Sequence, residues 1–191
     1  YQVLFEDLVG RQWDGLDLKS VPEGSPTLEQ VPVVANSHGL SAVVKKEGVA
    51  PVVRLPATWD DYLAALAKKD RHELRRKLRR LEAAGPAKQS ECSSPGSHDS
   101  CMDDFFRLMR VSSPDKAEFM TKDRERFFTE VAEVAAARGH LKLSMLELDG
   151  IRVASCINFD YEDTFLLYNS GYDPQHSQLS VSLVNKAWTI K

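Results

Sequence analysis

The C-terminal part of the chain shows the clearest alternation of apolar and polar positions. Residues 141–145 and 151–161 alternate with the period of two expected of a half-buried strand, and a third apolar segment covers residues 164–170. Asp149 and Gly150 suit the positive φ angles of a two-residue hairpin turn between the first two segments. We therefore expect three successive strands that form a meander.

A helix is expected to follow this meander and to start near Ser180. Ser180 is a suitable N-cap residue, and Leu179 and Val184 have the spacing of a hydrophobic staple. A helix N-terminus presents unpaired N–H groups and partial positive charge, so residues 178–183 form a candidate anion site. An ordinary capped helix explains the same residues and is the preferred interpretation of the pattern alone. The position of the helix after a strand and a loop at the end of a meander favours the anion site.

Apolar residues spaced by three and four positions predict helices in the middle of the chain. One long helix is expected from Thr58 or Asp60 to the stop signal at Gly85 and Pro86, and a second over residues 102–111. A third is expected to start after the N-cap Thr121 and to end near Arg138. Its inward-facing residues are expected to be Phe127, Phe128, Val131 and Val134.

Residues 1–55 are expected to form a separate region. Thr27 is suited to cap a short helix, and strands are predicted at residues 33–35, 41–45 and 52–55. This pattern is typical of half of an α/β layer, so we predict two regions, 1–55 and 56–191. The chain starts with Tyr1 and its last helix has no stop signal, and we expect both ends to lie within a longer protein.

The distribution of charge distinguishes one segment of the chain, residues 68–80. The 191 residues are 42% hydrophobic and 28% charged, as in a soluble globular protein, and no run has the roughly 18 apolar residues of a membrane span. The net charge is −3, but residues 68–80 carry eight Lys or Arg against Asp70 and Glu73. This basic helix could be a solvated face, a phosphate-binding surface or a nucleic-acid contact. The acidic remainder and the lack of interleaved aromatic residues speak against nucleic acid.

The three cysteines indicate free thiols. Cys92, Cys101 and Cys156 are odd in number and lack a CxxC spacing, which favours a reducing, cytoplasmic location. Cys92, His98 and Cys101 lack a fourth ligand for zinc, so we interpret residues 86–100 as an exposed Ser-rich connection and expect no metal. No hydrolase elbow, P-loop or dinucleotide-binding motif occurs in the chain.

Four segments in order carry a family resemblance over residues 56–191. They are PATWDDYLAALAKKDRHELRRKLRRLEAAG, SPDKAEFM, LSMLELDGIRVASCINFDY and LLYNSGYDPQHSQLSVSL. Together they resemble the acyltransferase domain of bacterial FemAB-like and cellulose-biosynthesis-type (CelD-like) GNAT proteins. Val181 and Ser182 stand where Pro-Gly is more usual in that family.

The resemblance implies an α/β (α+β) GNAT fold, in which a mixed, twisted sheet has helices on both faces and often occurs as two tandem copies. Residues 1–55 would then be the end of a first copy, and residues 56–191 a second copy truncated at its C-terminus. It also implies transfer of an acyl group, typically acetyl, from acyl-CoA to an amine or hydroxyl. The acceptor would be a small molecule or a component of the cell envelope or of polysaccharide metabolism.

The resemblance also assigns site residues. The donor pyrophosphate would lie on the helix start after the third strand, and the thioester would lie along residues 167–171. The residues expected to bind acyl-CoA are Ser170, Gly171, Ser180, Val181, Ser182 and Leu183. Acyl transfer needs an oxyanion donor, a base and an acid for the leaving thiolate, for which the candidates are Tyr168, Asn169, Tyr172 and His176. The candidates for binding an anionic substrate are Lys116, Arg75, Arg76 and Arg79.

Two other functions remain open. Fem-type relatives use aminoacyl-tRNA as the donor, so the basic helix at residues 68–80 could bind tRNA or another RNA. Alternatively, the chain could be a catalytically silent GNAT-like interaction domain.

Overall fold

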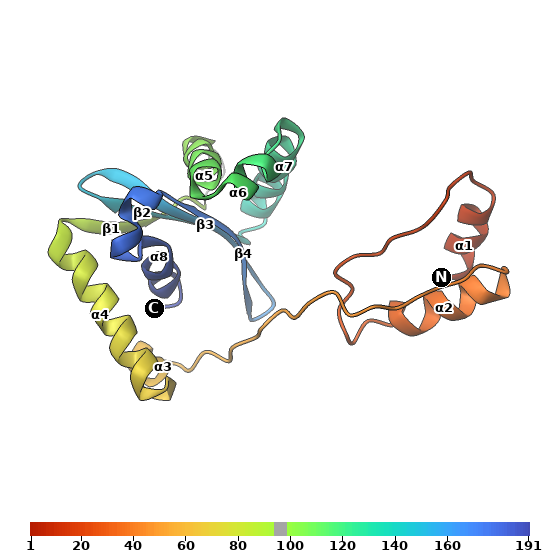
Figure 1. Ribbon diagram of the computed structural model, residues 1–191, viewed down its shortest axis with the longest axis horizontal. Helices are drawn as coiled ribbons and strands as arrows, with labels where there is room; N and C mark the ends of the chain where they lie inside the picture. Colours follow the sequence, from red (N-terminus) through yellow and green to blue (C-terminus); the bar gives the residue numbers. More distant parts are fainter. Residues whose placement is uncertain (94–98) are drawn as a thin grey trace. The chain divides into compact units, whose positions relative to one another are not determined.

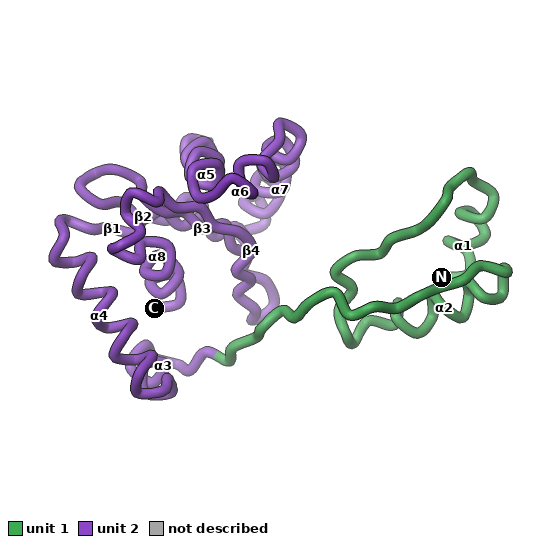
Figure 2. The backbone as a smooth tube through the Cα atoms, viewed as in Figure 1, with its two compact units in different colours: residues 1–54 green, residues 55–191 purple. Residues whose placement is uncertain are grey.

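The computed structural model describes residues 1–93 and 99–191. The chain divides into two compact units, residues 1–54 and residues 55–191, which Figure 2 colours separately.

The first unit contains two helices, α1 (Gln2–Val9) and α2 (Thr27–Ser37). Its small core consists of Phe5, Val34 and Ala35, with Val31, Leu40 and Ala42 packed against them. The remaining residues are loops and extended segments. The burial of so few apolar side chains leaves this unit with little hydrophobic stabilisation of its own.

The strands predicted for residues 1–55 are not formed. Residues 33–35 belong to α2, which also extends well beyond the short helix expected there and has Pro26 rather than Thr27 at its N-cap. The valine-rich segments at residues 41–45 and 52–55 have no strand assignment, and Val43 and Val52 are 76% and 87% exposed. A strand needs a pairing partner, and this unit, which is described throughout, supplies none. The assignment of residues 1–55 to a first GNAT copy stays a prediction.

The second unit begins with two helices where one was predicted. The helices are α3 (Trp59–Ala65) and α4 (Lys68–Ala84), and the backbone between them is extended at Leu66. Thr58 is the N-cap of α3, as predicted, and its Oγ1 accepts a hydrogen bond from the Asp61 N–H at 3.1 Å. Arg71 donates to the carbonyl oxygens of Leu63, Ala64 and Leu66, so it closes the C-terminal end of α3. The break places both helices around one small apolar cluster.

Four strands form one antiparallel sheet in the order β1-β2-β3-β4. They are β1 (Ala87–Glu91), β2 (Leu141–Leu148), β3 (Ile151–Tyr161) and β4 (Thr164–Tyr172). The meander of β2, β3 and β4 confirms the prediction, whereas β1 replaces part of the connection predicted for residues 86–100. β1 is polar and lacks a periodic signal, and its pairing with β2 defines it as a strand.

The hairpin turn at Asp149 and Gly150 has the predicted conformation, and the second hairpin turn has the same one. Asp149 and Gly150 have φ angles of 52° and 77°, and Glu162 and Asp163 have φ angles of 45° and 58°. Two successive positive φ angles match the right-handed twist of the flanking strands. These turns set the register in which β3 pairs with both neighbours.

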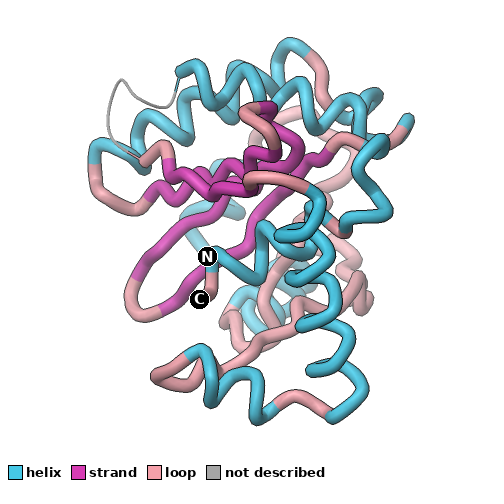
Figure 3. The backbone as a smooth tube through the Cα atoms, turned by 90° about the vertical axis from the view of Figure 1, so that its left-hand side faces the viewer, coloured by secondary structure: helices cyan, strands magenta, loops and turns pink. Residues whose placement is uncertain are grey.

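Helices cover both faces of the sheet (Figures 1 and 3). One face carries α5 (Asp99–Ser112), α6 (Pro114–Phe119) and α7 (Lys122–Ala137), and the other carries α4 and α8 (Val181–Thr189). We call these the α5–α7 side and the α8 side. The arrangement confirms the predicted α/β class with helices on both faces of the sheet, and every pairing within the described strands is antiparallel.

The α5–α7 side is closed by a large apolar core. Phe105, Phe128, Leu143 and Ile157 are each at most 2% exposed there. In α7 the buried residues are Phe128, Ala132 and Ala136, one stripe with a step of four. Phe127 and Val134, which were predicted to face inward, are 53% and 57% exposed. The sequence offered two adjacent apolar stripes on this helix, and packing against the sheet selected one.

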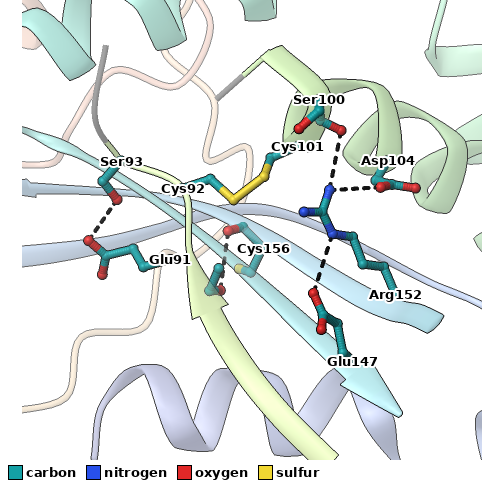
Figure 4. Close-up of a disulfide and its surroundings, with 10 residues drawn as sticks. Glu91, Cys92, Ser93, Ser100, Cys101, Asp104, Glu147, Arg152 and Cys156 are labelled. Carbon is teal, nitrogen blue, oxygen red and sulfur yellow. Dashed lines mark hydrogen bonds and ion pairs between the residues drawn. A yellow bond between two sulfur atoms is a disulfide. The ribbon is translucent and has the colours of Figure 1, made fainter. Parts of the chain in front are cut away.

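A disulfide joins the end of β1 to α5. Cys92 and Cys101 form this bond with their Cα atoms 6.4 Å apart, and both residues are buried (Figure 4). The prediction of free thiols is therefore wrong for these two residues, and the free thiol among the described residues is Cys156. The argument for a reducing compartment is lost with it. His98, which was considered with them as a metal ligand, lies outside the described residues.

An ion-pair cluster holds α5 to the sheet beside this disulfide. Arg152 of β3 lies 2.8 Å from an Asp104 carboxylate oxygen and 3.6 Å from Glu147, and it also donates to the Ser100 carbonyl (Figure 4). Arg107 contacts Asp104 as well and donates to the Arg152 carbonyl at 3.1 Å. These contacts and the disulfide fix the start of α5 relative to β1 and β3.

Candidate anion site and acyl-transfer cleft

The N-terminus of α8 has no side-chain cap. A 3-10 helix (Pro174–Leu179) precedes it, and Ser180 joins the two with a left-handed backbone (φ 56°, ψ 35°). Ser180 therefore occupies the predicted N-cap position, but its hydroxyl makes no capping hydrogen bond. The first turn of α8 contains no acidic residue, and Val184 N–H donates to the Ser180 carbonyl at 3.0 Å. The N–H groups of residues 181–183 precede that bond and have no i−4 partner within the helix.

Cationic side chains surround this helix end. Lys77 of α4 and Lys186 of α8 line a cavity of about 300 Å³ together with Ser180, Val181 and Ser182. Arg80 of α4 donates to the Gln178 carbonyl at 2.8 Å and so joins α4 to the segment before α8. The two lysines, the unpaired N–H groups and the helix dipole favour negative charge there, although Lys77 also lies 3.6 Å from the Glu73 carboxylate.

The cavity fits a phosphate or diphosphate group. Its volume of about 300 Å³ leaves room for such a group, and the cavity opens to solvent, so a longer ligand can extend beyond it. The residues that line it include Ser180, Val181, Ser182 and Leu183, the four assigned to the donor pyrophosphate by resemblance.

Tyr172 links this cavity to the end of β4. Its side chain lines the cavity and packs against the apolar core of the α8 side. Its backbone N–H donates to Ser112 Oγ at 2.7 Å, and Ser112 Oγ lies 3.0 Å from the Tyr172 carbonyl oxygen. Ser112 Oγ therefore accepts the hydrogen bond of the Tyr172 N–H, and its single proton is shared between the carbonyl oxygens of Tyr172 and Leu108.

The other residues assigned to the cleft lie along β4, on both sides of the sheet. A register shift in the β3–β4 pairing falls at Tyr168, whose ring packs against Phe128 and Phe159 on the α5–α7 side. Asn169 Oδ1 accepts a hydrogen bond from the Ser170 N–H at 2.9 Å. Gly171 is buried, and a Cβ there would lie 2.4 Å from the Met109 backbone nitrogen. Close packing of α5 on β4 therefore explains glycine at position 171.

Lys116 projects from α6 to this same edge. Its Nζ donates to the Ser170 carbonyl oxygen, and its side chain is half-buried. Burial lowers the pKa of the Lys116 ammonium, the positive charge of Lys186 lowers it further, and Cys156 opposes these effects. In the part of the chain that the structure describes, no carboxylate forms an ion pair with Lys116.

His176 lies apart from the cavity wall. Its Nδ1 is 3.9 Å from the Asp173 carboxylate and has no hydrogen-bond partner among the described residues. His176 belongs to the 3-10 helix and is not among the residues that line the cavity. A role as the general base would require this segment to rearrange.

The predicted arginines are not at the cavity. Arg75 and Arg79 are exposed, and Arg76 pairs with Glu73 at 2.7 Å, which lowers the pKa of that carboxyl. The cationic residues that reach the site, Lys77 and Arg80, were not assigned to it by the sequence analysis, and neither was Lys186. Lys77 flanks the apolar stripe of Leu74, Leu78 and Leu81. This position beside the buried face of α4 was the feature of the sequence that could have indicated its place at the cavity.

A partly buried polar network joins α8 to the sheet. Gln89 Nε2 donates to the Asn185 carbonyl and side-chain oxygens, both at 2.8 Å, and to Thr189 Oγ1 at 3.1 Å. Asn185 Nδ2 lies 3.4 Å from Ser144 Oγ. Buried amides and hydroxyls need such partners, so the network fixes the position of α8 relative to β1 and β2.

Neither a membrane-spanning helix nor a cluster of metal ligands occurs among the described residues. No helix there is long and apolar enough to cross a membrane. No group of three His, Cys, Asp or Glu residues there lies close enough together to hold a metal ion.

The second unit is an α/β domain in which a meander is packed between helices, and the helix after its last strand starts without a side-chain cap beside two lysines. A family model described as "Acetyltransferase (GNAT) domain" matches residues 68–189, more than half of the chain's 191 residues. The chain therefore belongs to the GNAT acetyltransferase family. Membership supports acyl transfer with acyl-CoA as co-substrate. No curated protein gives a significant match to the chain.

Proposed function

We propose that residues 55–191 bind acyl-CoA, typically acetyl-CoA, with its diphosphate at the N-terminus of α8 and transfer the acyl group beside the end of β4. The single observation that carries the proposal is the cavity at residues 180–183, where two lysines face a helix start with no cap. The acceptor would be an amine or hydroxyl of a small molecule or a cell-envelope component. The FemAB-like character of the chain is part of this proposal.

Side chains at the cavity have suitable roles in such a transfer. The N–H groups of residues 181–183, together with Lys77 and Lys186, would neutralise the donor diphosphate. Tyr172, which lines the cavity, is a candidate to protonate the leaving thiolate. We expect Tyr172→Phe to lower kcat and to leave the affinity for CoA unchanged.

Binding of CoA tests the proposal directly. A ligand at about 100 times its Kd should stabilise the chain by about 2.7 kcal/mol, which a thermal shift detects. Lys77→Gln and Lys186→Gln should each weaken CoA binding about tenfold, or about 1.4 kcal/mol. Lys69→Gln removes an exposed charge elsewhere on α4 and should leave affinity unchanged. If neither CoA nor acetyl-CoA shifts the transition, the proposal fails.

A second function is supported by the outer face of α4. Lys68, His72, Arg75 and Arg79 follow one face of this helix, are exposed, and form no ion pair within the described residues. Such a stripe suits the phosphates of an RNA, including the tRNA of an aminoacyl donor. RNA retention that falls steeply with salt and is lost in Arg75→Ala/Arg79→Ala would support this function. Retention unchanged by that double variant would refute it.

A further inference from the structure

Two consecutive serines fix the corner between α5 and α6 to the edge of β4. Ser112 bonds the backbone of Tyr172, as described above, and its Oγ also lies 2.8 Å from the Leu108 carbonyl oxygen. Ser113 is the N-cap of α6, and its side chain accepts a hydrogen bond from the Lys116 N–H at 3.3 Å. The backbone of Lys116 is thus positioned by contacts on both sides of the corner.

The Lys116 amine is held where an acyl donor would lie. Its Nζ contacts the carbonyl oxygen of Ser170, in the part of β4 that the GNAT resemblance assigns to the thioester. Ser170 pairs with Cys156 across the sheet, and Tyr172, two residues further, lines the cavity at α8. The Lys116 amine therefore lies against β4 at Ser170, two residues before Tyr172, which lines the cavity at α8.

The surroundings of Lys116 favour a reactive amine. In an ion pair, a carboxylate stabilises the ammonium form and makes the nitrogen unreactive, and the described residues supply none to Lys116. Burial and the charge of Lys186 from α8 both lower the pKa of Lys116, whereas Cys156 of β3 raises it. More of the amine is consequently neutral near pH 8 than for an exposed lysine, and the neutral amine is the nucleophile.

We propose that Lys116 is a self-acylation site, to which the chain transfers the acyl group of bound acyl-CoA when no acceptor is present. The Nζ lone pair attacks the thioester carbonyl carbon, a C–N bond forms, and the C–S bond breaks. The nitrogen loses one proton, and the departing thiolate takes up one proton. The product is a neutral amide on Lys116 and free CoA. The inference rests on the proposed function because it needs acyl-CoA in the β4 cleft.

Acylation would change the site it occupies. The amide removes the positive charge of Lys116 from the neighbourhood of Lys186 and adds bulk beside Ser170. The modified side chain would therefore occupy the cleft that an acceptor has to enter.

The test uses the full chain with acetyl-CoA and no acceptor. Intact mass should show the addition of one acetyl group, and peptide mapping should place it on Lys116. The label should resist hydroxylamine, which removes a thioester from Cys156 but leaves an amide. The rate should rise with pH and level off below pH 10.5, the ordinary lysine value.

Lys116→Arg should abolish the label, because it keeps the charge and a donor for Ser170 but lacks the nucleophilic amine. Lys122→Arg makes the same change at an exposed residue of α7 and should label like the parent chain. Thermal shift with CoA, which carries no acyl group, measures donor binding in each variant and also shows that it is folded.

The outcomes separate the two proposals. CoA binding with label on Lys116 supports the inference. Three results with CoA binding overturn the inference and leave the proposed function standing. They are no label on Lys116, label on Lys186 or Lys77 instead, and equal label on Lys116 and Lys122. No CoA binding overturns the proposed function, and the inference fails with it.

Discussion

The two sides of the sheet are built from different kinds of contact. The α5–α7 side is an apolar core in which Phe105, Phe128 and Leu143 are almost completely buried, and a disulfide closes its edge. The α8 side has a smaller apolar core around Leu81 and Val184, and beside it lies the polar network of Gln89, Asn185 and Ser144. The first side is held by apolar packing, whereas on the second a polar network also fixes a helix whose N-terminus has no side-chain cap.

This difference also appears in the helix caps. Thr121 closes α7 by accepting a hydrogen bond from the Arg124 N–H at 3.3 Å, and Ser113 closes α6 in the same way. Ser180 leaves the start of α8 open. The helices α1, α2 and α4 also start without a side-chain cap, so an uncapped start is not peculiar to α8. The start of α8 differs in that Lys77 and Lys186 line a cavity beside it.

Phe105→Ala should give the largest loss of stability. Phe105 is 0% exposed and packs against Phe106 and Phe128, so its truncation should lower the free energy of unfolding by about 3–5 kcal/mol. Urea unfolding measures this loss. Phe127→Ala, at a residue 53% exposed on α7, is the control and should cost well under half as much. Equal losses would mean that the α5–α7 side does not distinguish core from surface as described.

Reduction of the Cys92–Cys101 disulfide should have the next largest effect. The bond closes a short loop, so its loss should lower the free energy of unfolding by roughly 2–3 kcal/mol. Urea unfolding with and without a reductant measures the change. The double variant Cys92→Ser/Cys101→Ser should have the same free energy of unfolding with and without the reductant. In the unfolded, unreduced chain, thiol titration should detect Cys156 alone. Detection of all three thiols would contradict the disulfide.

The free thiol on the α8 side predicts a loss of stability in alkali. Burial is the main cause that raises the pKa of Cys156, from 9.0 to about 11, with Lys186, Asn158 and Lys116 opposing it. Above pH 9 the unfolded chain releases this proton while the folded chain retains it, so stability falls as pH rises to about 11. The loss approaches about 2–3 kcal/mol. Cys156→Ala should flatten this part of the stability profile, and an unchanged slope would refute the assignment.

The caps predict the smallest and most direct contrast. Thr121→Ala should lower the free energy of unfolding by about 1 kcal/mol, because the Arg124 N–H loses its acceptor. Ser180→Ala should change it by no more than a few tenths, because no capping bond exists to be lost. Urea unfolding of both variants gives the comparison. If Ser180→Ala lowers the free energy of unfolding as much as Thr121→Ala does, Ser180 is an ordinary cap, and the argument for an anion site at α8 is weakened.

Local sequence determined the features that depend on a few neighbouring residues. Asp149-Gly150 specified a turn because these residues tolerate positive φ, and Thr58 and Thr121 specified helix starts because their hydroxyls reach N–H groups three residues away. The alternation in residues 141–161 specified the meander. The order of short motifs indicated the GNAT family, which the family model confirms.

Tertiary structure decided what depends on distant partners. The valines at residues 41–45 have strand propensity but no strand to pair with, whereas polar β1 becomes a strand because β2 lies beside it. α7 buries Phe128 and exposes Phe127 because a single stripe can face the sheet. Packing likewise brought Lys77, rather than Arg75 or Arg79, to the α8 cavity, and placed Lys116 against Ser170. Strand pairing and electrostatic interactions depend on residues that are distant in the sequence. The sequence therefore supplied the cationic residues, and the fold determined which of them lie at the candidate site.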